Sequence, residues 1–221
     1  MSNLGSVRLD GCMADDVSVV NSARVSFGKK VESLSDADKG LINFLMRERH
    51  GTPFEHNSFR FHVRCPIFVA REWFRHRIGS FNEFSGRYAE FSPDAYVPAL
   101  EDIRSQVGKP GAYSFEKVDD FVAISAREII EESNNRAFVN YEDLLKLGVA
   151  KEVARTVIPV GAFTEFYWTV NARSLMNFIS LRNDDNAQYE IRMLAKEVES
   201  IFADLMPVTY EAFVLNNRVA P

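Results

Sequence analysis

Arginine and histidine side chains concentrate in one segment of the 221-residue chain, residues 47–87. The segment holds eight arginines, no lysine, four glutamates and all four histidines, so its formal charge is +4, whereas that of the whole chain is −5. Arginine guanidinium groups form planar, paired hydrogen bonds with phosphate and carboxylate groups. The segment therefore predicts a binding site for a phosphate or another anion, and a solvated charged surface is the alternative interpretation.

Composition excludes several other classes of protein. The residues outside the segment carry a net charge of −9, which would repel a long polyanion, so binding to nucleic acids in general is not expected. The longest uncharged apolar run, residues 65–70, is far shorter than the ~20 residues that span a bilayer, so no membrane contact is expected. Cys12 and Cys65 are too few for a disulfide framework or a cysteine-based zinc site, and no metal is expected. Because the first residues also lack a secretory signal, these features favour the cytoplasm.

The most specific motif is Arg-His-Arg at residues 75–77, followed by a loop that contains Ser85, Gly86 and Arg87. Small loop residues let backbone N–H groups approach a phosphate, and the arginines supply positive charge. An arginine-rich helix end followed by an ordinary loop is the alternative. The glycine-rich motifs of dinucleotide-binding and P-loop proteins and the Gly-x-Ser-x-Gly motif of hydrolases do not occur.

Hydrophobic periodicity predicts the elements that position these residues. Ser35 opens a helix with a capping box in which Asp38 replaces the usual glutamate. Alternating apolar residues predict two strands, residues 58–65 and 160–170. The remaining expected helices are residues 66–77, 114–147, 149–157, 172–181 and 187–205, with a long loop at 78–98. Helices outnumber strands, so the sequence predicts an α+β fold in one domain, residues 1–221, with a small antiparallel or mixed sheet.

These motifs together resemble the flavin-dependent thymidylate synthases. The signature of that family, Arg-His-Arg followed by seven residues and Ser, fits Arg75, His76, Arg77 and Ser85. Further blocks resemble the family in the same order along the chain. They are residues 23–27, 50–56, 153–155, 171–182 and 187–188.

The resemblance implies a helix-rich fold that assembles as a homotetramer with shared active sites. It also implies reductive methylation of dUMP to dTMP, with 5,10-methylenetetrahydrofolate as carbon donor and FAD, reduced by NADPH, as hydride donor. The residues that it implies for dUMP are Glu72, Arg75, Glu83, Phe84, Ser85, Gly86, Arg87, Arg155 and Arg182. Those that it implies for FAD are Thr52, Arg75, His76, Arg77, Glu83, Asn171, Arg173 and Asn177.

Arg182 is the expected catalytic residue, because its permanent charge can stabilise negative charge on the pyrimidine near N3. Arg173 and Asn177 are four residues apart on an expected helix and can face one ligand, whereas Arg182 points elsewhere. Cys65 lies on the apolar face of an expected strand, which favours a packing role rather than a nucleophile. Ser85 has no base beside it in the sequence, so it is assigned to phosphate binding.

Two other hypotheses remain open at this point. The first is a non-catalytic nucleotide- or RNA-binding protein that uses the arginine-rich residues 47–87. It accounts for the charge cluster but not for the block at residues 171–177, and it predicts binding that weakens steeply with salt. The second is a flavoenzyme that acts on another pyrimidine nucleotide, such as uracil in RNA, against which the acidity of the remaining residues argues.

Overall fold

The computed structural model describes residues 4–109 and 112–221, which gather in two compact units. We call the first the sheet unit; it comprises Gly5–Cys65, Val69–Glu83 and Glu165–Pro221. We call the second the long-helix unit; it comprises Leu4, Pro66–Phe68 and Phe84–Thr164. The segments of the two units alternate along the chain, so neither is a contiguous block, and the single domain over residues 1–221 stays a prediction.

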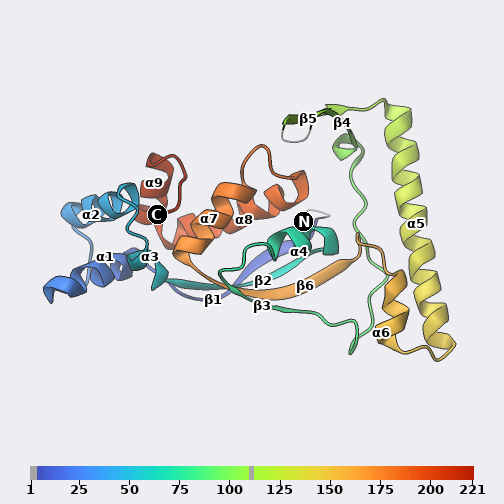
Figure 1. The fold of residues 1–221 in the computed structure, drawn as a ribbon, viewed down its shortest axis with the longest axis horizontal. Helices are drawn as coiled ribbons and strands as arrows, with labels where there is room; N and C mark the ends of the chain where they lie inside the picture. The colour runs from blue at the N-terminus through green and yellow to red at the C-terminus, as the bar shows by residue number, and fades with distance from the viewer. Residues whose placement is uncertain (1–3, 110–111) are drawn as a thin grey trace. The chain divides into compact units, whose positions relative to one another are not determined.

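A four-stranded sheet with strand order β1-β2-β6-β3 lies at the centre of the sheet unit (Figure 1). Two antiparallel pairs form its edges, β1 (Ser6–Met13) with β2 (Ser58–Pro66) and β3 (Ser80–Glu83) with β6 (Phe163–Asn171). The alternation predicted for β2 and β6 is confirmed, because every second side chain is buried. The predicted loop over residues 78–98 is wrong at β3, an edge strand whose mostly exposed polar residues give no apolar alternation.

Two helices, α7 (Ala172–Arg182) and α8 (Tyr189–Leu205), cover one face of this sheet (Figure 1). Trp168 of β6 packs against Phe178 of α7 with ring centroids 4.9 Å apart, and Phe59 of β2 packs against Phe202 of α8 at 6.1 Å. Each fully buried ring of this kind contributes about 1.5–3 kcal/mol relative to an exposed one. The packing therefore fixes the position of α7 on the sheet.

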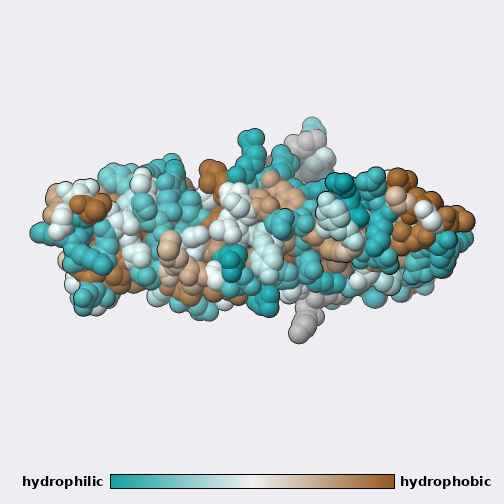
Figure 2. All heavy atoms as spheres, turned by 90° about the horizontal axis from the view of Figure 1, so that it is seen from below, coloured by the Kyte–Doolittle hydropathy of each residue, from teal (hydrophilic) through white to brown (hydrophobic). Residues whose placement is uncertain are grey.

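The opposite face of the sheet is polar. On this face, Nε2 of His62 lies 3.4 Å from the carboxylate of Glu165, and Arg60 forms an ion pair with Asp10 at 2.7 Å. Figure 2, which views the molecule from below, shows hydrophilic residues over much of this side. The sheet is therefore buried on the helix side, as a half-exposed antiparallel sheet should be.

Further helices belong to the sheet unit. They are α1 (Asp16–Arg24), α2 (Asp36–Arg47), α3 (Thr52–Glu55) and α9 (Pro207–Leu215). The capping box of α2 is confirmed, since the Asp38 carboxylate accepts a hydrogen bond from the backbone N–H of Ser35 at 2.9 Å. Helix α4 (Ile67–Trp73) is shorter than predicted at both ends, since Pro66 ends β2 instead of lying in the first turn of the helix and residues 74–77 lie beyond the last helical residue. The sequence predicted no element at β1, α1 or α9.

The long-helix unit is built on α5 (Asp120–Lys146). The helix predicted from residue 114 is wrong over its first residues, which belong to the hairpin of β4 (Arg104–Lys109) and β5 (Ala112–Lys117). Asp119 caps α5 by accepting a hydrogen bond from the N–H of Phe121 at 2.9 Å, which sets the actual start. The helix predicted at residues 149–157 consists of α6 (Lys151–Ala154) and one 3₁₀ turn (Arg155–Val157).

The α+β class with its small sheets and many helices is therefore confirmed. Among the described residues, no helix is both long and apolar enough to cross a membrane.

Candidate functional site

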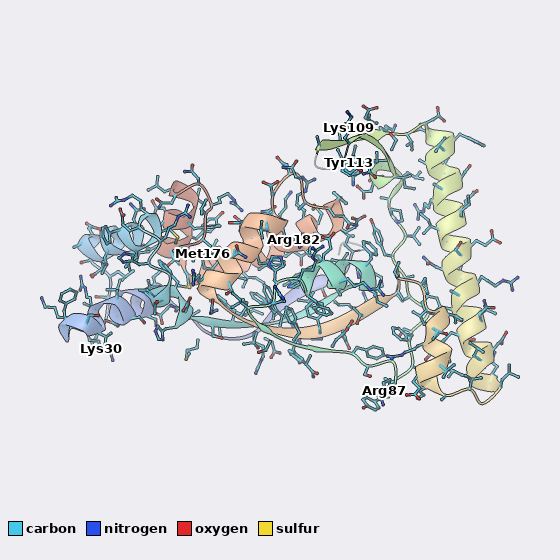
Figure 3. The ribbon with its side chains drawn as sticks, viewed as in Figure 1. Lys30, Arg87, Lys109, Tyr113, Met176 and Arg182 are labelled. Atoms are coloured by element: carbon cyan, nitrogen blue, oxygen red, sulfur yellow. The ribbon has the colours of Figure 1, made fainter. Side chains whose placement is uncertain are left out.

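Arg182 ends α7, where Figure 3 labels it, and its side chain contacts the C-terminal end of α4 and the residues after it. Its Nε donates a hydrogen bond to Nε2 of His76 at 2.9 Å. Its Nη1 donates to the carboxylate of Glu72 at 3.4 Å, and its Nη2 to the Glu72 carbonyl at 3.3 Å. We call Arg182, Glu72 and His76 the Arg182 cluster. The cluster joins two residues assigned to dUMP with one assigned to FAD.

The surroundings of His76 in the cluster set its protonation state. Burial, and next the positive charge of Arg182, lower the pKa of His76 to about 4. His76 is therefore neutral at pH 7, and the nitrogen that faces Arg182 is its acceptor. An arginine side chain carries five N–H donors. Among the described residues, three of those of Arg182 donate hydrogen bonds to His76 and Glu72, so two remain for a ligand.

A cavity of about 450 Å³ lies beside the cluster and brings together four of the residues assigned to FAD. His76 and Arg77 reach it from the segment after α4, and Arg173 and Asn177 reach it from α7. We call it the flavin-set cavity. Arg173 and Asn177 line the same space, as their spacing of four predicts. Its remaining lining residues are Glu55, Ile78, Ser174, Ala220 and Pro221.

Arg173 is held at the wall of this cavity by two partners. Its Nη1 forms an ion pair with Glu55 at 2.6 Å, and its Nε donates to the carbonyl of Pro221 at 2.6 Å. Gly51 lies against the guanidinium, and a Cβ at that position would come within 2.6 Å of Nε. The position of Arg173 therefore depends on the absence of a side chain at residue 51.

Other residues assigned to FAD lie elsewhere in the sheet unit. Thr52 lines a second cavity, of about 580 Å³, together with Ser26, Arg49, His50 and other residues of the first 56. Asn171 caps α7, because its side-chain oxygen accepts a hydrogen bond from the N–H of Ser174 at 2.8 Å. Neither residue is among those that line the flavin-set cavity.

The nine residues assigned to dUMP fall in different units. Glu72, Arg75, Glu83 and Arg182 belong to the sheet unit, where Arg75 and Glu83 are exposed. Phe84, Ser85, Gly86, Arg87 and Arg155 belong to the long-helix unit.

Within the long-helix unit, the loop after β3 is locally ordered. The N–H of Arg87 donates to Oγ of Ser85 at 3.4 Å, and Nε of Arg87 lies 3.5 Å from the carboxylate of Glu152. A Cβ at Gly86 would lie 2.4 Å from the ring of Phe91, so this position accepts only glycine without rearrangement. Arg155 is exposed on the 3₁₀ turn after α6.

Sequence analysis assigned no role to Glu55 or to the C-terminal residues that line the flavin-set cavity. Glu55 lies in the block at residues 50–56, and the signal that could have identified it is a negative charge between His50 and His56. Pro221 has no comparable signal, because its carbonyl meets Arg173 only through the tertiary fold. Among the described residues, no group of three metal-ligating side chains comes together.

Cys65 is buried in β2, as predicted. Burial, and next the negative charge of Glu83, raise the pKa of its thiol. A reactive cysteine needs the thiolate form at neutral pH, so Cys65 is not suited to act as a nucleophile.

Comparison with known proteins places the chain in a family. Residues 9–208 match the model of the family described as "Thymidylate synthase complementing protein". The flavin-dependent thymidylate synthase of Thermosipho africanus is 47% identical over 210 residues, covering 95% of this chain and 91% of the relative. That of Streptomyces avermitilis is 45% identical, covering 94% of this chain and 90% of the relative.

Solved structures agree with these sequence matches. A UMP/dUMP methylase, PolB from Streptomyces cacaoi, bound with 5-Br UMP, is 42% identical and superposes with a TM-score of 0.91, over 98% of this chain and 96% of that one. The same methylase bound with 5-Br dUMP gives the same TM-score. The family match, the near-complete coverage of the relatives and the shared fold lead to one conclusion: the chain belongs to the flavin-dependent thymidylate synthases.

Proposed function

We propose that this chain catalyses the reductive methylation of dUMP to dTMP. The one-carbon unit comes from 5,10-methylenetetrahydrofolate and the two electrons from NADPH, so tetrahydrofolate and NADP⁺ are released with dTMP. One observation carries the proposal: His76 both accepts a hydrogen bond from Arg182 and lines the flavin-set cavity with Arg173 and Asn177. Residues assigned to the nucleotide and to the flavin thus meet at one side chain.

The residues of the flavin-set cavity fit FAD by their chemistry. Arg77 and Arg173 offer guanidinium groups suited to a diphosphate, and the amide of Asn177 offers both a donor and an acceptor. Gly51 leaves the space that Arg173 occupies. When bound, FAD supplies the hydride that the reaction requires, after NADPH has reduced it.

Arg182 is proposed to activate the pyrimidine. Its two remaining N–H donors would hold the uracil ring, and its permanent charge would stabilise the negative charge that develops near N3 when C5 attacks the one-carbon unit. Glu72 and His76 hold the guanidinium in place at 2.9–3.4 Å. His76 does so as a neutral group, so it adds no positive charge of its own. The buried Cys65 supports activation by charge rather than by a covalent bond to cysteine.

Ser85, Gly86 and Arg87 are proposed to bind phosphate in the long-helix unit. Gly86 brings the backbone close to Phe91, and the ion pair of Arg87 with Glu152 is exposed, so solvent screening makes it weak. A phosphate can therefore replace Glu152 as the partner of Arg87. The other residues assigned to dUMP and FAD in the sequence analysis remain part of the same proposal.

We also propose that copies of the chain associate as a homotetramer in the cytoplasm. Helix α5 exposes Phe121 and Ile129 by 76% and 65%, and its C-cap residue Leu147 is 79% exposed. Figure 2 shows hydrophobic residues gathered near the end of α5 and α6. Exposed apolar surface of this kind favours association. Sedimentation should give a particle about four times the chain mass, and a stable, active monomer would contradict this part of the proposal.

The nucleotide could instead be UMP, since the similar solved structures are described as UMP/dUMP methylases. The ratio of kcat/KM values for dUMP and UMP decides between the two. A value well above one supports dUMP, and a value below one makes UMP the substrate.

The proposed reaction predicts that dUMP stimulates NADPH oxidation by the FAD-loaded protein under controlled oxygen. A flavin-loaded protein that never oxidises NADPH would require a different reductant. Binding of nucleotide without flavin, with steep weakening by salt, would instead favour the non-catalytic hypothesis.

A further inference from the structure

Glu199 of α8 is a buried carboxylate that belongs to neither assigned set of site residues. The residue is 7% exposed. Its oxygens accept hydrogen bonds from the Asn183 amide, from the Tyr210 hydroxyl at 2.9 Å, and from both Nη atoms of Arg218 at 2.6 Å. Burial alone would raise the pKa of Glu199, but these hydrogen bonds outweigh it and lower the pKa. Glu199 is therefore ionised and fully partnered.

Two of its connections lead to the last turn of α7. Asn183, whose side chain binds Glu199, is the residue directly after Arg182 and the C-cap of α7. Ser180 of the same turn donates a hydrogen bond to the carbonyl of Arg218, the arginine that pairs with Glu199. Asn183 and Ser180, on either side of Arg182, are thus both tied to the ion pair of Glu199 and Arg218.

The end of α7 needs such a tie. The last turn of any helix has carbonyl groups without helical partners, and helix ends open more easily than helix centres. The segment that follows α7 is a turn in which Asp184 accepts from the backbone N–H of Asn186, and both residues are exposed. Ile179 of the last turn is buried, so the core holds the inner side of that turn. Beyond this core contact, Asn183 and Ser180 are tied by their hydrogen bonds to Glu199 and to its partner Arg218.

We propose that Glu199 is a positioning residue for Arg182: through Asn183 it fixes the last turn of α7, so that the guanidinium reaches Glu72 and His76. This inference rests on the proposed function, because it matters for turnover only if Arg182 acts on the nucleotide. A purely structural ion pair is the competing explanation. Such a pair would change the stability of the protein but not the turnover of the folded, FAD-loaded molecules.

Two variants separate the explanations. Asn183→Ala removes the link to α7 but leaves the Glu199–Arg218 pair intact, and Glu199→Gln keeps the size of the side chain but removes its charge. The matched control is Glu211→Gln, at an exposed position on α9. For each variant, kcat and the KM for dUMP are measured per FAD-loaded site, well below its unfolding temperature. The visible spectrum and the Kd of FAD are recorded in parallel.

Asn183→Ala and Glu199→Gln should each lower kcat by about ten- to a hundredfold, the order of loss expected when a catalytic group is misplaced by about 1 Å. The Kd of FAD should change by less than about twofold, and the control should match the wild type. If Glu199→Gln does not fold, Asn183→Ala alone decides. Wild-type kcat in Asn183→Ala, in a protein that forms dTMP, would overturn the inference and leave the proposed function intact.

A second readout tests the path through Arg182. Asn183→Ala is combined with Arg182→Ala, so that there is no Arg182 side chain left to position. In this background, Asn183→Ala should lower kcat by less than about twofold relative to Arg182→Ala alone. An equal loss in both backgrounds would show that Asn183 acts independently of Arg182 and would overturn the inference. If the wild type forms no dTMP at all, the proposed function and the inference fail together.

Discussion

Replacing Arg182 with alanine should remove most dTMP formation while the protein still folds and binds FAD. Arg182 is the residue whose charge is proposed to stabilise the activated pyrimidine, and alanine leaves no donor in its place. Removing one such donor typically costs about 3–4 kcal/mol of transition-state stabilisation, which corresponds to roughly a hundred- to a thousandfold in kcat.

The expected effect of this substitution on the free energy of unfolding is smaller than its effect on the transition state. Arg182 makes three hydrogen bonds, of which only the one to His76, at 2.9 Å, is short. The ion pair with Glu72 is partly open to solvent, since the two side chains are 20% and 30% exposed. With about 0.5–1.5 kcal/mol for each well-formed hydrogen bond, we expect a loss of about 1–3 kcal/mol in the free energy of unfolding.

The assay measures dTMP by chromatography, per FAD-loaded site, together with the flavin spectrum and the urea unfolding midpoint. Arg182→Lys should be intermediate, because an ammonium group keeps the charge but not the planar set of donors that meets His76 and Glu72. Arg8→Ala, at an exposed position on β1, is the matched control. Turnover of Arg182→Ala within about threefold of the wild type would refute the reasoning.

Three further predictions concern the neighbours of Arg182. The pKa of His76 is lowered to about 4 from its ordinary 6.5, so between these pH values the unfolded chain binds more protons than the folded chain. The free energy of unfolding should therefore fall as the pH drops from 6.5 to 4, and His76→Gln should flatten this part of the plot of urea midpoint against pH. An unchanged plot would contradict the assigned pKa. Gly51→Ala places a Cβ within 2.6 Å of Arg173 and should push the Arg173 side chain away. Because FAD then loses one charged contact, its dissociation constant, measured by fluorescence titration, should rise about tenfold. An unchanged dissociation constant would show that Arg173 does not contact FAD. Cys65→Ala should keep kcat within about twofold while it lowers the unfolding midpoint, and a complete loss of activity in folded protein would point to cysteine chemistry.

Elements with strong local signals were predictable from the sequence. The alternation of β2 and β6 and the capping box of α2 are set by residues next to one another in the chain. Strand β3 was missed because its pairing with β6 supplies the stability that its own polar residues do not. In β5, the apolar residues at 113 and 115 have the spacing of a strand, but the helix pattern that begins at residue 118 was extended back over them. The turn chemistry at Asp119 decides where the helix starts.

The candidate site was predictable as a set of residue types but not as an arrangement. Arg182 and His76 are 106 positions apart, and only the packing of α7 on the sheet brings them to 2.9 Å. Glu199 was missed, although a signal existed: it lies four residues after Ala195 and three before Phe202, on the buried side of α8. A glutamate on an apolar helix face needs partners, and these come from distant positions that the sequence does not connect.

The most direct test of the central claim is whether the purified protein makes dTMP. The protein is incubated with FAD, dUMP, 5,10-methylenetetrahydrofolate and NADPH under controlled oxygen, and dTMP and NADP⁺ are measured together. The proposed function predicts one dTMP for each NADPH consumed in the coupled reaction, and no dTMP when FAD, dUMP or the folate is omitted. An FAD-loaded protein that forms no dTMP from the complete mixture would contradict the account.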